Sequence, residues 1–142
     1  NIGPKADGTI CDEEKKILHA LGEWTSLNRE AIWGTSPYKV YGEGRRLKSG
    51  SFQERNHYSS HDFRYTYKPC HIYAFALKPN QKGIYHLKAL RHSMDGFHFI
   101  IKKITVLGGG PVKWDLNDRR LCIHVQDAPH TKMPLVFDIE VD

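Results

Sequence analysis

The hydrophobic pattern of this chain changes once, and the change constrains the fold more than any other feature. Between residues 12 and 27 apolar side chains recur at spacings of three and four: Ile17, Leu18, Leu21, Trp24 and Leu27. That spacing predicts an amphipathic helix with one buried face. From residue 45 onward, short runs alternate between apolar and polar residues, as β-strands do. We therefore expect one helix followed by a β domain.

The stretch 23–44 joins the two patterns and holds two of the three tryptophans. Its rings stand beside residues that allow or fix unusual backbone angles, namely Gly34, Pro37, Gly42 and Gly44. This composition favours a packed crossover between the helix and the β domain. The alternative is an aromatic-rich loop that only covers one edge of a core.

The helix has recognisable ends. Cys11 or Asp12 is the expected N-cap, and Asp12, Glu13 and Glu14 place negative charge in the first turn, where the helix dipole favours it. These acids are therefore interpreted as a solvated first turn and not as catalytic carboxylates. Asn28 is expected to end the helix in a left-handed conformation.

Seven or eight short strands are predicted after the crossover, with turn residues between them. The loop 44–60 is expected to hold one short strand near Phe52, and a break is expected at Lys102–Lys103 inside a long strand. The other strands are expected at 63–68, 72–77, 84–90, 97–107, 112–114, 121–125 and 135–141. This spacing is typical of an antiparallel β-sandwich, so the expected fold class is mainly β with one preceding α-helix.

Composition excludes several classes of function. The net charge is +5, but the lysines and arginines are scattered singly or in pairs, which argues against a nucleic-acid partner. No apolar run approaches the ~20 residues that a membrane-spanning helix needs, so no membrane partner is expected. The chain begins with Asn1 and not with methionine, and we expect that first residue to lie inside a longer polypeptide.

Cysteine and histidine residues are the candidate metal ligands of the sequence. Three cysteines without a C-x-x-C pair favour free thiols, with one bridge plus a free thiol as the alternative. Among nine histidines, Cys122 with His124 and His57 with His61 have suggestive spacing. Neither pair is joined by a recognisable second pair, so the sequence predicts no metal site and no cofactor.

Two further features were weighed for function. The run 108–110 is glycine-only, but Pro111 and a strand follow it, so it is interpreted as a turn and not as a phosphate-binding loop. Several aromatic residues could form a sugar-stacking surface, although most are expected to face the core: Tyr58, Tyr65, Tyr73, Tyr85 and Trp114. A free-standing carbohydrate-binding module and a protein-interaction module that uses the helix face therefore remain alternatives.

The first 44 residues carry a specific resemblance. Residues 1–10 read Asn-Ile-Gly-Pro-Lys-Ala-Asp-Gly-Thr-Ile, and residues 28–38 read Asn-Arg-Glu-Ala-Ile-Trp-Gly-Thr-Ser-Pro-Tyr. Together with Gly22-Glu23-Trp24, these segments resemble the C-terminal part of the α-L-fucosidases of glycoside hydrolase family 29. The likeness extends more loosely to the later strands. Two departures, Cys11 where proline is common and Arg29 where glycine is common, lie at helix boundaries.

The resemblance implies a division of labour. Residues 1–44 would be the tail of a (β/α)₈-like catalytic barrel, including its last helix, and residues 45–142 a C-terminal β-sandwich. The family's retaining mechanism uses two carboxylates, and the resemblance puts both upstream of Asn1, so no catalytic residue is expected in this chain.

The resemblance also implies partners. The rest of the barrel and, through the complete enzyme, fucosylated glycans are expected. Asn1 and Asp7 are candidates for the rim of the substrate pocket, because barrel active sites lie at the C-terminal ends of the strands. The resemblance leaves extracellular, periplasmic and lysosomal compartments open.

Overall fold

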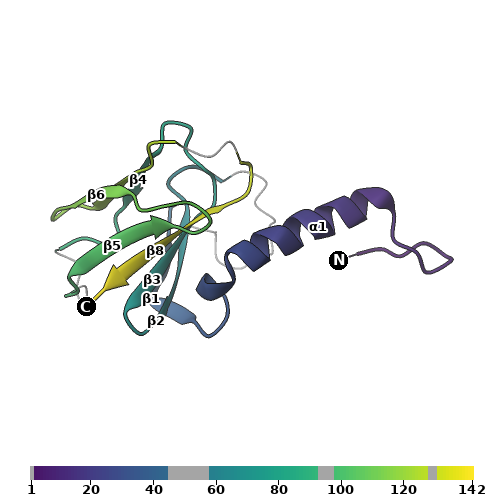
Figure 1. The fold of residues 1–142 in the computed structure, drawn as a ribbon, viewed down its shortest axis with the longest axis horizontal. Helices are drawn as coiled ribbons and strands as arrows, with labels where there is room; N and C mark the ends of the chain where they lie inside the picture. Colours follow the sequence, from purple (N-terminus) through teal and green to yellow (C-terminus); the bar gives the residue numbers. More distant parts are fainter. Residues whose placement is uncertain (1, 45–57, 93–97, 128–130) are drawn as a thin grey trace.

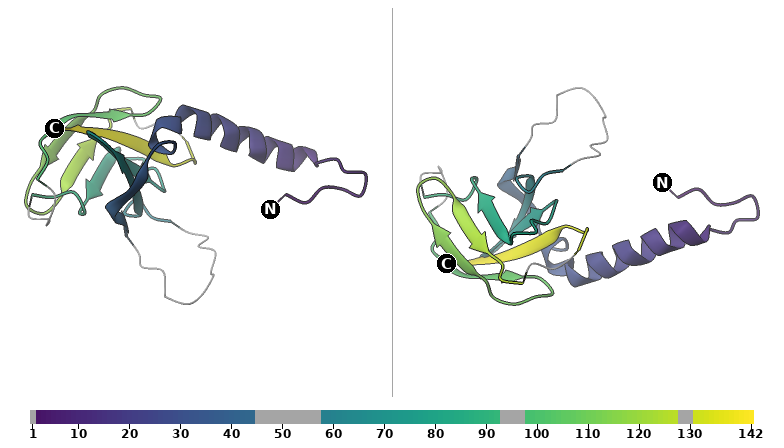
Figure 2. Two further views of the ribbon diagram at one scale, coloured as in Figure 1. Left: turned by 90° about the horizontal axis from the view of Figure 1, so that it is seen from below. Right: turned by 90° about the horizontal axis from the view of Figure 1, so that it is seen from above.

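The computed structural model describes residues 2–44, 58–92, 98–127 and 131–142. Helix α1 (Asp12–Leu27) projects from a β-sandwich like an arm, and the N-terminus lies far from the strands (Figures 1 and 2). A short 3₁₀ helix, η1 (Arg29–Ala31), joins the arm to the sandwich. The described part of the chain thus has the expected class, mainly β with one preceding α-helix.

In the described residues, eight antiparallel strands form two sheets. One sheet has the order β1-β2-β3-β8-β5 and the other β4-β7-β6. Their bounds are β1 (Ser36–Glu43), β2 (Phe63–Lys68), β3 (His71–Ala76), β4 (Ile84–Leu87), β5 (Ile101–Val106), β6 (Lys113–Leu116), β7 (Leu121–His124) and β8 (Leu135–Val141). The order places β3 and β8 in the interior of the large sheet, which agrees with the apolar run of β3.

The core lies between the two sheets. Alternate residues of each strand point inward, so Tyr85 of β4 meets Phe137 of β8 with ring centroids 5.0 Å apart. Leu121 and Ile123 of β7 complete the inner face of the small sheet. The outer face of the large sheet carries a second cluster, in which Tyr73 and Val136 pack against Ala31.

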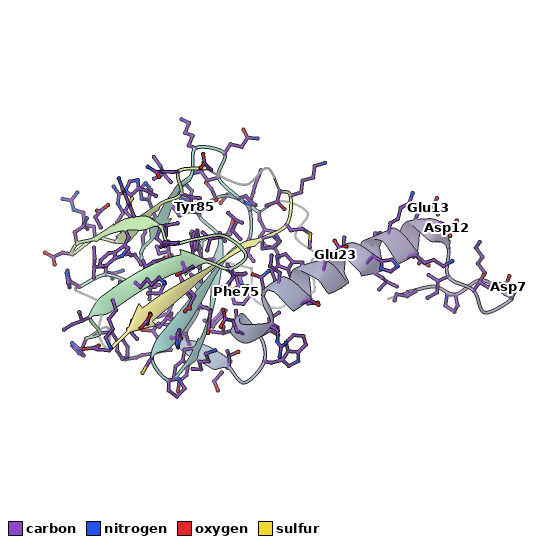
Figure 3. The ribbon with its side chains drawn as sticks, viewed as in Figure 1. Asp7, Asp12, Glu13, Glu23, Phe75 and Tyr85 are labelled. Carbon is purple, nitrogen blue, oxygen red and sulfur yellow. The ribbon has the colours of Figure 1, made fainter. Side chains whose placement is uncertain are left out.

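The end of helix α1 is attached to this second cluster. Trp24 donates its indole N–H to the carbonyl oxygen of Pro134 at 2.7 Å, and its ring lies 6.3 Å from that of Phe75. Leu27 lies against the turn at Gly108, where an added Cβ would come within 2.7 Å of the leucine side chain. The last turn of the helix is thereby fixed to the sandwich (Figure 3).

The prediction that one face of helix α1 is buried is wrong for the described part of the chain. No residue of α1 is buried, and Ile17 and Leu21 are 67% and 48% exposed. The periodicity correctly identified an apolar face, but only the last turn meets the sandwich. Within the part of the chain that the structure describes, no helix is long and apolar enough to cross a membrane.

The helix also ends differently from the expectation. Asn28 has φ −103° and is therefore not left-handed. Its backbone N–H and its side-chain amide both donate to the carbonyl oxygen of Trp24, at 3.1 and 2.9 Å. A buried asparagine thus closes the helix by side-chain bonding, and the first left-handed residue after it is Gly34, with φ 70°.

Most strand predictions are confirmed, and the differences have local reasons. The irregularity expected at Lys102–Lys103 is a register shift between Ile101 and Lys103 in the pairing of β5 with β8. The hairpin turn between β6 and β7 lies at 117–120, because Asp115 and Leu116 still pair with β7. The crossover contains an unexpected strand, β1, on the edge of the large sheet, where Pro37 needs no ladder hydrogen bond. The strand expected near Phe52 lies outside the described residues.

Candidate functional site

The sequence analysis named two candidates for the rim of a substrate pocket, Asn1 and Asp7, and both precede helix α1. Asn1 lies outside the described residues. Asp7 is fully exposed at the far end of the arm, where its carboxylate accepts the backbone N–H of Thr9 at 3.0 Å and the Thr9 hydroxyl at 2.7 Å (Figure 3). These two bonds lower the pKa of Asp7 and keep it ionised. The described part of the chain brings no second carboxylate into contact with it.

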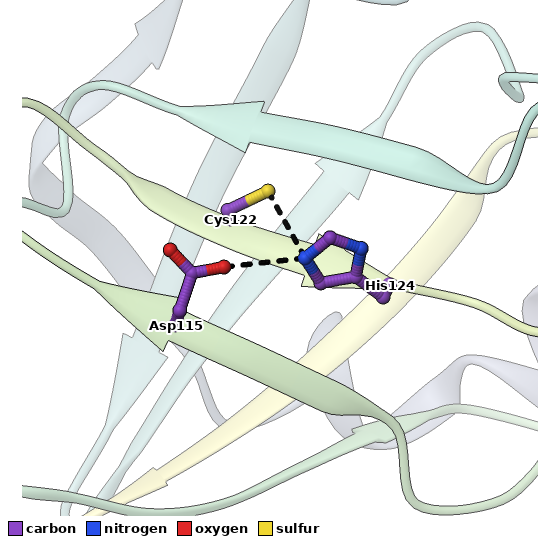
Figure 4. Close-up of side chains that lie close together, drawn as sticks. All are labelled: Asp115, Cys122 and His124. Atoms are coloured by element: carbon purple, nitrogen blue, oxygen red, sulfur yellow. Dashed lines mark hydrogen bonds and ion pairs between the residues drawn. The ribbon is translucent and has the colours of Figure 1, made fainter.

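A compact group of ligating side chains occupies the outer face of the small sheet. Cys122 and His124 alternate outward from β7, while their neighbours Leu121 and Ile123 point into the core. Asp115 of β6 lies directly opposite Cys122 in the strand pairing. The sulfur of Cys122 is 3.4 Å from Nε2 of His124, and Oδ2 of Asp115 is 3.2 Å from the same nitrogen (Figure 4).

His86 extends this group on the other side. It pairs with Cys122 across β4 and β7, so His86, Cys122 and Asp115 form one cross-strand row on the same face. Its Nδ1 is inaccessible to solvent and has no hydrogen-bond partner. Burial lowers the pKa of His86, and the positive charge of Arg120 lowers it further, so the ring is neutral near pH 7.

The thiol of Cys122 is protonated in this environment. Burial raises its pKa, and the negative charge of Asp115 raises it further, whereas Arg120 acts in the opposite direction. All three cysteines have free thiols, with Cys122 the buried one. A neutral thiol is a poor nucleophile, so the group does not have the chemistry of an activated cysteine.

A half-buried carboxylate, that of Glu43, is another polar feature of the sandwich. Glu43 of β1 accepts the hydroxyl of Tyr65 at 2.6 Å and the backbone N–H groups of Lys88 and Ala89 at 2.9–3.0 Å. Burial raises the pKa of Glu43 in spite of these donors. Burial and the Glu43 charge also raise the pKa of Tyr65 well above its usual value, so the phenol remains a donor. This arrangement ties the edge strand β1 to the segment that follows β4.

A groove of about 450 Å³ lies where the helix meets the sandwich. Trp24, Leu27 and Asn28 line one side, and the glycine turn 108–110 lines the other. That turn is closed by a hydrogen bond from Gly109 to Val106, which confirms its assignment as a turn. Asp127 is the single carboxylate of the described lining, whereas a retaining glycosidase needs two.

The aromatic residues do not form a stacking surface among the described residues. Tyr65, Tyr73 and Tyr85 are buried, and Trp114 is half-buried against the core. Tyr58 is the only exposed member of the five candidates. The expectation that most of these rings face the core is confirmed.

Sequence reasoning found one half of the ligating group. The Cys122–His124 spacing was visible, but Asp115 and His86 join the pair only through the strand order β4-β7-β6. The sequence could have indicated them only if the alternation of inward and outward residues within 84–87 and 113–116 had been combined with the pairing of both strands to β7. His57, the partner considered for His61, lies outside the described residues.

Comparison with known proteins gives a consistent result. No protein-family model matches the chain. The human tissue α-L-fucosidase is 30% identical over 139 residues, which are 96% of this chain and 26% of that protein. An α-L-fucosidase of Branchiostoma floridae is 30% identical over 115 residues, covering 80% of this chain and 21% of that protein. The chain thus spans about a quarter of the length of these curated relatives.

Solved structures agree on the fold. The α-fucosidase of Thermotoga maritima superposes with a TM-score of 0.68 at 24% identity, over 99% of this chain and 29% of that one. An α-L-fucosidase of glycoside hydrolase family 29 from Bacteroides thetaiotaomicron gives 0.65 at 19% identity, over 100% of this chain and 28% of its own. The chain therefore corresponds to the C-terminal part of the α-L-fucosidases of glycoside hydrolase family 29, to which it is related by both sequence and fold.

Proposed function

We propose that this chain is the non-catalytic C-terminal portion of a retaining α-L-fucosidase that removes terminal α-L-fucosyl residues from glycans. In this proposal the catalytic carboxylates belong to a barrel upstream of the chain. Helix α1 is the last helix of that barrel, and the sandwich supports the barrel from outside. The relatives support the proposal because both are α-L-fucosidases and the matching region is only 26% of the length of one and 21% of the other.

The observation that carries the proposal is the exposed apolar face of helix α1. Ile17 and Leu21 lie on one side of a helix that has no buried residue. A globular protein normally buries the apolar stripe of an amphipathic helix, because each large side chain gains roughly 1.5–3 kcal/mol from burial. The first turns of helix α1 project away from the sandwich, and both side chains are exposed, so the stripe fits a partner outside the described residues (Figure 1).

The proposed division of the chain follows from this. Residues 1–44 would belong functionally to the barrel and residues 45–142 to the sandwich, with β1 hydrogen-bonded into the large sheet and shared between the two. The polar loop before the helix, with Asp7 and Asn1, would lie near the rim of the substrate pocket. Asp7 fits a scaffolding role there, because Thr9 already occupies its carboxylate.

Activity measurements test the proposal directly. The purified 142-residue chain and the longest polypeptide of its source that contains it are each assayed with 4-nitrophenyl α-L-fucoside. We expect release of 4-nitrophenol by the longer protein and none by the chain alone. Turnover by the pure chain, or a native protein whose mass matches the chain alone, would overturn the proposal. In the second case, retention of fucosylated glycans on an array would support the carbohydrate-binding alternative.

A further inference from the structure

We propose that Asp115, Cys122 and His124 form a binding site for a divalent transition metal ion of the zinc type. The site lies on the outer face of the small sheet, opposite the core. It provides one carboxylate oxygen, one sulfur and one imidazole nitrogen, and these three atoms all lie within 4.8 Å of one another. All three residue types are established ligands of protein-bound zinc.

The spacing of these atoms matches a tetrahedral site. With zinc–ligand bonds of the usual length, two ligand atoms at tetrahedral corners stand ~3.3–3.6 Å apart. The observed separations are 3.4 Å for the Cys122 sulfur to His124 Nε2 and 3.2 Å for Asp115 Oδ2 to the same nitrogen. These two separations fit a tetrahedral site, and the third, between the Cys122 sulfur and the Asp115 carboxylate, is at most 4.8 Å.

Hydrogen bonding within the group does not satisfy all of its atoms. His124 Nε2 can donate one proton or accept one, yet it lies within bonding distance of both a thiol and a carboxylate. His86 stands in the same cross-strand row, and its Nδ1 has neither solvent nor a protein partner. A metal ion can take a lone pair from each of the three ligand atoms at once. Solvent holds the fourth position, with His86 as the adjacent protein group.

The ligand atoms set the type of ion. Binding requires the thiol of Cys122 to release its proton to solvent, which leaves one thiolate and one carboxylate around a doubly charged cation. The ligand set then balances the charge of the ion. The positive charges of Lys113, which pairs with His124 across the strands, and of Arg120 repel any cation, so tight binding needs the thiolate. A sulfur and a nitrogen ligand therefore favour zinc over calcium or magnesium.

The backbone holds the ligands in place before an ion arrives. Cys122 and His124 are two residues apart on β7, which is hydrogen-bonded on both sides, and Asp115 is fixed opposite Cys122 on β6. Asp115 and His124 are substantially exposed, with side-chain exposures of 62% and 45%. An ion can thus approach from solvent on the Asp115–His124 side and reach the buried sulfur last.

Cobalt(II) titration of the intact chain under reducing conditions tests the proposal. Thiolate coordination gives a charge-transfer band in the near ultraviolet, and tetrahedral coordination gives intense visible bands. We expect both bands to appear at one equivalent of Co²⁺ and to be displaced by Zn²⁺. Cys122→Ser should remove the charge-transfer band, and His124→Ala should weaken binding roughly 100-fold or more, which exceeds the loss of an outer-shell partner.

A matched control uses the other Cys-His-Asp set of the chain. Cys70 is exposed and precedes His71, whose Nδ1 lies 2.8 Å from Oδ1 of Asp138. The sulfur of Cys70 does not belong to a group of potential metal ligands among the described residues. Cys70→Ser should leave the cobalt spectrum and the affinity unchanged. A spectrum without a charge-transfer band, or one lost in Cys70→Ser and kept in Cys122→Ser, would overturn the proposal. Circular dichroism of each variant checks folding, and His124→Ala, an exposed position, keeps the test valid if Cys122→Ser does not fold.

Discussion

Helix α1 and the β-sandwich differ in where their apolar side chains find partners. In the sandwich, inward-facing residues of both sheets meet in one core, and residues such as Phe137 and Tyr85 are completely buried. In the helix, no residue is buried. The sandwich therefore derives its stability from contacts within the chain, whereas the arm presents a face whose burial requires another surface.

The two regions meet in a small contact. Trp24 is the main link, through its hydrogen bond to Pro134 and its contact with Phe75. Beyond that turn toward the N-terminus, the helix depends on its own backbone hydrogen bonds. An isolated helix of this length is marginal in water. We therefore expect the first turns of α1 to unfold locally far more often than the strands do.

Removing a core ring should give the largest effect and sharpen the contrast. Phe137→Ala deletes a fully buried side chain that contacts Tyr85 across the two sheets. Such substitutions typically lower the free energy of unfolding by about 3–5 kcal/mol. Urea denaturation followed by tryptophan fluorescence measures the change. A loss below about 1 kcal/mol would mean that the sandwich core is not the source of stability.

The next effect concerns the polar interior of the sandwich. Tyr65→Phe removes the hydroxyl that donates to Glu43 at 2.6 Å and leaves a half-buried carboxylate with fewer donors. Hydrogen bonds to charged groups contribute about 1.5–3 kcal/mol, so we expect a loss of that size near pH 7. Tyr67→Phe, on the same strand but exposed, is the matched control and should change stability little. Equal losses in both variants would contradict the assignment.

Glu43 should also make stability depend on pH. Because burial raises its folded pKa above the ordinary value of 4.5, the folded state holds this proton more tightly than the unfolded state does. The associated stability is fully present below about pH 4.5 and is lost as pH rises through the folded pKa. Glu43→Gln removes this dependence, so wild type should gain stability relative to the variant between pH 7 and pH 4. A difference that stays constant across this range would show that Glu43 does not titrate as described.

The link between the two regions can be weakened separately. Trp24→Phe keeps a ring against Phe75 but removes the donor to Pro134, a neutral hydrogen bond that contributes about 1 kcal/mol. Hydrogen exchange should speed up in the last turn of α1 and in the segment before β8, and not in the small sheet. A uniform increase across all strands would mean that the arm and the sandwich unfold as one unit.

The sequence alone predicted the regions in which local pattern and fold agree. The strict alternation of 135–141 identified β8, and the two-sided apolar run at 72–77 identified an interior strand. The edge strand β1 was missed because Pro37 and Gly42 interrupt its alternation of Tyr38 and Val40 toward the core. Both residues are tolerated there, since one side of an edge strand has no neighbour to bond.

The candidate metal site and the helix face needed information that local pattern does not contain. Cys122 and His124 are two residues apart, so their common direction could be predicted, but Asp115 and His86 join them through non-local strand pairing. Likewise, the spacing of Ile17 and Leu21 shows which side of the helix is apolar. The spacing does not show whether the surface that covers this side belongs to the same chain. No such surface lies within the described residues.

The smallest expected change in folding stability is at helix α1. This prediction tests whether the apolar face of the helix is exposed in the free chain or packed against the sandwich. Ile17→Ser and Leu21→Ser alter exposed positions, so the free energy of unfolding of the sandwich should change by less than about 0.5 kcal/mol. If the apolar face associates with copies of itself in the isolated chain, the double variant should remain monomeric at concentrations where wild type forms larger species. Sedimentation velocity measures this, and His19→Ser, an exposed residue of the same helix, serves as the control.

A double variant that unfolds as readily as Phe137→Ala would mean that the helix is packed in the free chain. The contrast between a self-contained sandwich and an arm with an external partner would then be wrong.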